Sequence, residues 1–284
     1  MKSARSDPDR GFPDFEVFAL DVGLLGLVPV GVLLVHFLAS ATTKSRLTHE
    51  IGSLTPLSAF GHAFVHFSFG GLLANLLGYV VLTAVGYGVA VSIGERRWFH
   101  LSLVTVVITV PIIAGIVDGF VFGSVSSGTT ISIRGLSAVV AAIAGLLYVL
   151  YLGLLRRVYD PFAAVLGGCA LAIALVAGFA DGYATVPRSM VYALPLVAFG
   201  ILGVEGMRRA EWSLRNVRMW TLRAAVPSGV VVTATLLAAA AGLFPADLHV
   251  GGSFTNVFGH AVGWITGAVV AGWGHRYWTG VSWA

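Results

Sequence analysis

The sequence predicts an all-α fold: a polytopic transmembrane bundle of about eight helices. Of the 284 residues, 57% are apolar and 11% are charged, whereas a soluble domain carries roughly 25% charged residues. The mean hydropathy is +0.89. A chain this apolar cannot cover a water-facing surface, which excludes a soluble globular enzyme. Disorder is excluded as well, because disordered chains are polar and rich in charge.

Eight apolar runs approach the roughly 20 residues that a helix needs to cross the hydrocarbon core. They are 17–40, 70–93, 99–122, 135–155, 161–180, 189–205, 224–243 and 256–273. We therefore expect a transmembrane domain over 17–273 between cytoplasmic tails at 1–16 and 274–284. The first tail lacks a signal-peptide cleavage pattern, so the first span is expected to be retained. The less regular stretch 41–69 is expected at the outer membrane boundary.

The basic residues predict the orientation of these spans. If alternate loops are grouped, about 13 of the 17 Lys and Arg residues fall on one side and about 4 on the other. Cytoplasmic loops carry the excess of basic residues. Both termini are therefore expected in the cytoplasm of a multi-pass cell-membrane protein. Its one sizeable cytoplasmic loop, 207–223, is expected to lie on the lipid surface, with a regulatory partner as the alternative. The calculated pI of about 9.5 reflects this topology, since no basic patch with interleaved aromatics suggests nucleic acid.

Polar side chains inside a membrane are costly, so each is a candidate for function. The second, fourth and eighth spans are predicted to run from outside to inside. Asn75, Ser137 and His260 each lie near the outer end of one of these spans. Three polar groups from distant segments are thus expected at a similar depth on one face of the membrane.

Small residues indicate how two of these spans pack. His260, Gly263 and Gly267 lie on one helical stripe, and Ser137, Ala141 and Gly145 form a similar stripe in the fourth span. Such glycines let helix backbones approach closely in lipid. If the stripes face each other, the Ser137 hydroxyl reaches the imidazole of His260, the base that a serine nucleophile needs.

Three blocks of sequence resemble the rhomboid family of intramembrane serine proteases. They are His66-Phe67-Ser68-Phe69-Gly70-Gly71-Leu72-Leu73-Ala74-Asn75, Gly135-Leu136-Ser137-Ala138, and His260-Ala261-Val262-Gly263-Trp264-Ile265-Thr266-Gly267. Gly94-Glu95-Arg96-Arg97 also resembles the family's turn after its second helix. The resemblance covers 57–155 and 256–273, and it implies a rhomboid-like six-helix core plus two additional spans.

The resemblance implies a role for each matching residue. Ser137 would be the nucleophile, and His260 would be first general base and then general acid. The Ser137 backbone N–H and the Asn75 amide would hold the oxyanion, with His66 and Gly135 supporting the site. The implied activity is a serine endopeptidase that cleaves transmembrane segments of membrane proteins near the outer face. No metal and no organic cofactor is implied.

The sequence also departs from the family's pattern. The family's second histidine in this block falls on Gly71, the aromatic beneath the catalytic histidine falls on Ala141, and the last glycine of the serine motif is Ala138. Three spans separate the serine and histidine helices where the family has one, and either odd number keeps the direction of the histidine helix. These changes keep open a non-catalytic rhomboid-like protein that binds membrane proteins.

Other chemistries fit the sequence less well. His62 and His66 have zinc-ligand spacing, but Ala63 stands where a metalloprotease needs glutamate. Asp118 has no evident aspartate partner for an aspartyl protease. Cys169 lies in an apolar run and is expected to be a small buried apolar residue. A small-solute transporter is the remaining alternative, although no repeated half and no charge near the midplane supports it.

Overall fold

The computed structural model describes residues 13–123, 132–158, 164–165, 167–169, 171–173, 225–244, 249–250 and 253–279. Its longer helices are α1 (Phe15–Leu38), α4 (Phe69–Ser92), α5 (Arg96–Gly123), α6 (Ser137–Val158), α10 (Ala225–Leu243) and α11 (Val257–Thr279). Its short elements are α2 (Ala41–Leu47), α3 (Pro56–Gly61), the 3-10 turn η1 (His62–Phe64), β1 (His49–Glu50), β2 (Ser132–Ile133), β3 (His249–Val250) and β4 (Ser253–Phe254).

The predicted helical, multi-span architecture is confirmed in its coarse form. Five helices in the described part of the chain are long and apolar enough to cross a membrane, namely α1, α4, α5, α6 and α11. The apolar part of α10, Gly229–Leu243, is shorter. The predicted span 189–205 lies outside the described residues, and most of 161–180 does too.

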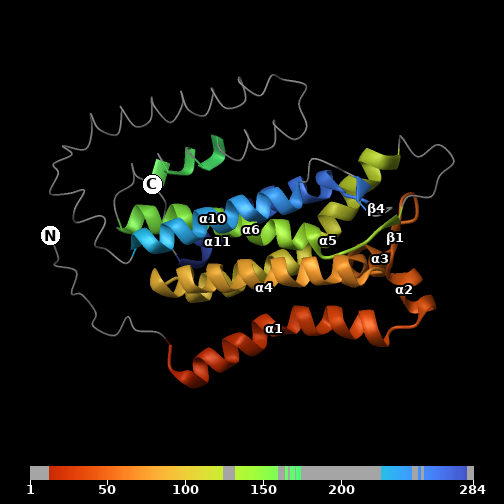
Figure 1. Ribbon diagram of the computed structural model, residues 1–284, viewed down its shortest axis with the longest axis horizontal. Coiled ribbons are helices and arrows are strands. Elements are labelled where there is room, and N and C mark those ends of the chain that lie inside the picture. The colour runs from red at the N-terminus through yellow and green to blue at the C-terminus, as the bar shows by residue number, and fades with distance from the viewer. Residues whose placement is uncertain are drawn as a thin grey trace.

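Helix α6 lies at the centre of the bundle, where α4, α5, α10 and α11 all contact it (Figure 1). Its residues from Ala141 to Ala144, and then Leu146 and Leu147, are completely buried. A helix that is apolar on every side is expected in such a position. The helix that carries Ser137 is therefore held on several sides.

Glycines bring α6 and α11 into backbone contact. A Cβ atom on Gly263 would overlap the carbonyl oxygen of Ala138, and one on Gly267 would overlap that of Ala142. Because both contacts advance together along the two chains, the helices run parallel. Contacts of Asn75 with Gly135 and of Gly78 with Val140 give α4 the same direction. The second, fourth and eighth predicted spans thus share one direction, as the sequence predicts.

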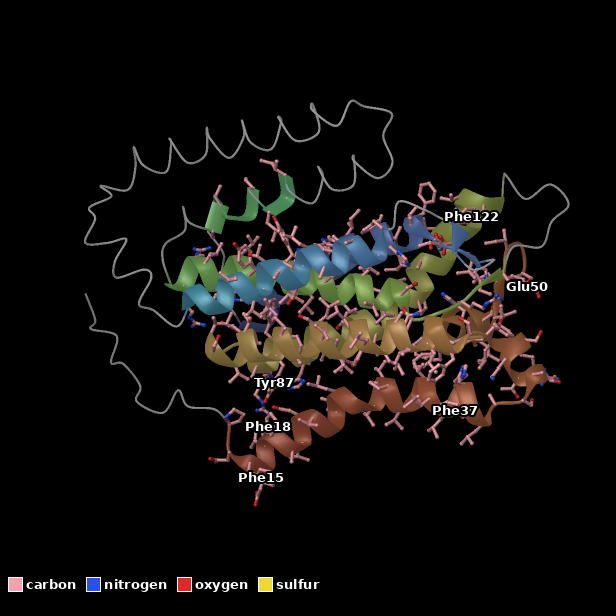
Figure 2. The ribbon with its side chains drawn as sticks, in the orientation of Figure 1. Phe15, Phe18, Phe37, Glu50, Tyr87 and Phe122 are labelled. Carbon is pink, nitrogen blue, oxygen red and sulfur yellow. The ribbon has the colours of Figure 1, made fainter. Side chains whose placement is uncertain are left out.

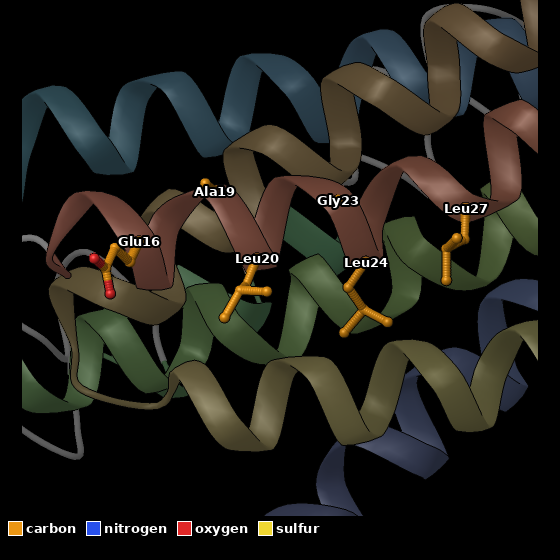
Figure 3. A pocket seen from close by; sticks show the side chains of 6 residues that line it. All are labelled: Glu16, Ala19, Leu20, Gly23, Leu24 and Leu27. Atoms are coloured by element: carbon orange, nitrogen blue, oxygen red, sulfur yellow. The ribbon is translucent and has the colours of Figure 1, made fainter.

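Helix α1 stands beside this core (Figure 2). Its Val32 side chain is completely buried, and polar contacts join it to α4 and α5 as well. The buried Asp21 carboxylate accepts hydrogen bonds from Tyr87 at 2.6 Å and from both Nε and Nη2 of Arg96. The Tyr79 hydroxyl donates to the Leu25 carbonyl at 3.0 Å. A shallow apolar groove runs along α1 and is lined by Glu16, Ala19, Leu20, Gly23, Leu24 and Leu27 (Figure 3). Its apolar surface suits lipid.

The connection between α1 and α4 folds over one end of the bundle. Helix α3 begins with a capping box between Thr55 and Ser58, which satisfies two amide groups that the helix leaves open. Strand β1 pairs antiparallel with β2, so that His49 lies opposite Ile133 just before α6. This pairing joins the stretch 41–69 to the segment just before α6, the helix that begins at Ser137.

Gly267→Ala is expected to destabilise the bundle by about 3 kcal/mol, because the added methyl group meets backbone that cannot move aside. Gly272→Ala is the matched control on the same helix, since a Cβ there has open space. Thermal unfolding in detergent measures both variants. Equal melting temperatures for the two would contradict the close contact of α6 with α11.

Candidate active site

Three of the predicted site residues meet at the start of α6. His66 Nε2 lies 3.0 Å from Asn75 Nδ2 and 3.4 Å from the backbone N of Leu136. A Cβ on Gly135 would lie 3.7 Å from both Asn75 Nδ2 and His66 Nε2. His66, Asn75 and Gly135 therefore form one polar cluster next to Ser137, although they come from separate segments.

Gly135 gives the chain the turn that starts this helix. Its φ angle is +107°, a left-handed conformation that favours glycine. Its N–H donates to the His62 carbonyl at 2.8 Å, and the His62 Nδ1 in turn donates to the Ser58 carbonyl at 2.9 Å. The segment before Ser137 is thus fixed to the connection between α1 and α4 by hydrogen bonds through His62.

His66 is neutral in this cluster. Its Nε2 can accept hydrogen bonds from Asn75 and Leu136 only if the ring proton sits on Nδ1. Burial lowers the pKa of His66 from 6.5 to about 4. Burial also lowers the pKa values of His62 and of His49, whose rings lie 6.0 Å apart. Three uncharged imidazoles therefore pack around the end of the bundle that carries Ser137.

Ser137 is the first residue of α6 and is half-buried. Within the described part of the chain its hydroxyl makes no hydrogen bond, neither to His260 nor to its own helix. At the start of a helix the backbone N–H groups have no acceptor inside the helix. The Ser137 hydroxyl and amide are therefore both available to an incoming group.

His260 lies in the first turn of α11 and is 5% exposed. Its Nδ1 lies 2.5 Å from the Leu243 carbonyl oxygen at the end of α10. A carbonyl can only accept, so Nδ1 carries the proton and Nε2 keeps its lone pair. The Phe244 ring packs edge-on against the imidazole at 6.0 Å. The ring is thus held in the tautomer that a general base requires.

The two predicted stripes face each other with a shift of one residue. Gly263 and Gly267 contact Ala138 and Ala142, rather than Ser137 and Ala141, while Gly145 meets the Trp264 carbonyl as expected. The starts of α6 and α11 consequently lie at the same end of the bundle.

The Asn75 amide is already occupied. One of its hydrogens goes to His66 Nε2, and the nitrogen also donates to the Gly71 carbonyl at 3.0 Å. An oxyanion could receive a hydrogen bond from Asn75 only in exchange for one of these. The predicted oxyanion role of Asn75 therefore requires a rearrangement.

Other polar residues singled out in the sequence have defined surroundings. His62 lies in η1 and His66 in the extended segment after it, so the pair does not share one helical face. Among the residues that the structure describes, no group of three His, Cys, Asp or Glu side chains could hold a metal ion. Asp118 does have a partner, because Asn256 Nδ2 donates to its Oδ2 at 2.7 Å.

Sequence reasoning missed the contribution of the end of α10. Leu243 acts through its carbonyl, which any residue type provides, and Phe244 directly follows the predicted span 224–243.

We expect His66 to make stability depend on pH. Its folded pKa of about 4 lies below the unfolded value of 6.5, so the stability it confers is complete above pH 6.5. That stability falls as the pH drops toward 4, by about 3 kcal/mol at most. Melting temperatures in detergent between pH 7 and 4.5 measure the loss. His66→Gln keeps an acceptor without a titratable group, and an unchanged pH slope in this variant would contradict the assignment.

The chain matches no family model, no curated protein and no solved structure.

Proposed function

We propose that the protein is a rhomboid-like intramembrane serine endopeptidase that cleaves transmembrane segments of membrane proteins near the outer face. The proposal rests on the three motif blocks and on one observation above all. Backbone contact between α6 and α11 holds Ala138 against Gly263. Ala138 directly follows Ser137, and Gly263 lies about one helical turn after His260. This contact supports a Ser-His dyad at one end of the bundle.

In the proposed reaction Ser137 Oγ attacks the carbonyl carbon of the scissile peptide, and His260 Nε2 takes the hydroxyl proton. The same proton then passes to the leaving amine as the C–N bond breaks. Water hydrolyses the acyl-enzyme with His260 again as base, which regenerates the serine. The hydrogen bond from Nδ1 to the Leu243 carbonyl supports this role, because it stabilises the imidazolium that forms in each step.

The oxyanion of the tetrahedral intermediate would be held first by the Ser137 backbone N–H. Asn75 would supply a second donor by exchanging its hydrogen bond with the Gly71 carbonyl or with His66 for one with the substrate. Loss of one such donor typically costs a hundredfold or more in rate. The substrate helix must unwind locally before it reaches these groups, since its carbonyls are hydrogen-bonded within the helix.

The non-catalytic alternative is favoured by a different observation. The Ser137 hydroxyl and the His260 imidazole make no hydrogen bond in the described structure, and both hydrogens of Asn75 are occupied. A protein of this kind would bind membrane proteins through the same end of the bundle without cutting them.

Ser137→Ala and His260→Ala are each expected to abolish labelling by a fluorophosphonate probe in detergent, because the probe reacts only with an activated serine. Ser132→Ala is the matched control, since this serine is exposed and lies five residues before Ser137. Labelling of the wild type that disappears in the first two variants supports the enzyme. A wild type that is not labelled but still captures transmembrane helices supports the binding protein.

The proposed orientation has both termini in the cytoplasm and the β1 segment outside. Cys169 is exposed, contrary to the sequence prediction, so it is first replaced by alanine. In this Cys169→Ala background, Ser53→Cys should react with an impermeant maleimide on intact cells, whereas Ser92→Cys should react only after lysis. Both serines are exposed and lie at opposite ends of the bundle. The reverse pattern would overturn the topology and the outer-face site with it.

A further inference from the structure

Helix α11 begins at a hydrogen-bonded pair that joins it to α5. The Asn256 Oδ1 accepts the Gly259 N–H at 2.9 Å, and the Asn256 Nδ2 donates to Asp118 Oδ2 at 2.7 Å. Asp118 is 1% exposed, and its Oδ1 has no hydrogen-bond partner in the described part of the chain. Burying a carboxylate costs free energy, and capping of the helix alone does not require Asp118.

The pair lies directly against the turn that carries His260. The His260 N–H donates to the Asn256 carbonyl at 3.1 Å, so Asn256 holds the backbone of both Gly259 and His260. A Cβ on Gly259 would lie 2.7 Å from Asn256 Nδ2 and 3.4 Å from Asp118 Oδ2. Gly259 thus lets the pair approach the turn closely.

An N-cap requires only the Asn256 Oδ1, and an exposed asparagine would supply it equally well. The second hydrogen bond, to Asp118, instead fixes the side chain that sets the start of the helix. Because Asp118 belongs to α5, the position of the His260 backbone is tied to a second helix, while the Leu243 carbonyl of α10 fixes the ring.

We propose that Asp118 and Asn256 form a positioning unit for His260, aligning its imidazole with Ser137. This inference rests on the proposed protease function. A small displacement of a reacting group costs up to about a hundredfold in rate, so loss of the unit should slow reaction at Ser137 while leaving the fold in place.

The test measures the rate constant of fluorophosphonate labelling of Ser137 in the full-length protein. Asp118→Ala removes the acceptor together with the costly buried charge but leaves the Asn256 cap intact. Labelling should slow by about tenfold or more with little change in melting temperature. Asp118→Asn retains an oxygen that can accept from Asn256, so it should recover most of the rate. Glu50→Gln, at an exposed residue of β1, controls for loss of a carboxylate.

A reciprocal exchange provides a second route if Asp118→Ala fails to fold. Asn256→Asp alone sets two carboxylates against each other, and labelling should slow by a similar factor. Asp118→Asn combined with Asn256→Asp restores a donor opposite an acceptor and keeps the cap, so the rate should return.

Wild-type rates in folded Asp118→Ala or in Asn256→Asp would overturn the positioning role while leaving the protease proposal standing. A folded double variant that does not recover would overturn it too. A wild type that the probe does not label would overturn both the protease proposal and this one.

Discussion

The close contact of α6 with α11 is the constraint on which the rest of the structure depends. Apolar helices gain little from one another in lipid, because the surrounding chains are equally apolar, so packing must come from close backbone approach. Gly263 and Gly267 allow that approach on one helix, and Gly145 allows it on the other. Since both helices are fixed in parallel register, their first turns lie at the same end. The relation of Ser137 to His260 follows from this register, not from any direct bond between them.

Several donors at that end find acceptors on the backbone carbonyl or the ring of a neutral histidine. Gly135 donates to the His62 carbonyl, and Leu136 and Asn75 donate to His66. Neutral histidines suit this position because they accept or donate without the desolvation cost of an ion. The Ser137 hydroxyl stands apart from this network.

Hydropathy and small-residue spacing were sufficient to predict the long helices that the structure describes and the facing of α6 and α11, but not the short helices α2 and α3 within 41–69. On α6 the predicted contacts were Ser137 and Ala141, whereas the observed contacts are Ala138 and Ala142. The rotation of the whole helix decides between them, and the positions of small residues alone do not reveal it. The Leu243 carbonyl and the pairing of Asp118 with Asn256 could not be predicted. The first involves a backbone atom, and the second joins residues 138 positions apart that only the completed bundle brings together.

The state of Asn75 links the cluster of His66, Asn75 and Gly135 to the proposed chemistry. As long as Asn75 donates to both His66 and Gly71, the proposed oxyanion site would have one donor, the Ser137 amide. A developing negative charge accepts a hydrogen bond more strongly than a neutral imidazole does. Asn75 would therefore turn toward substrate in the transition state more readily than in the ground state. Such an exchange strengthens transition-state binding selectively, and His66 keeps the Leu136 N–H as a partner when Asn75 leaves. In the proposed mechanism the same Asn75 amide would therefore bind His66 in the absence of substrate and the oxyanion in the transition state.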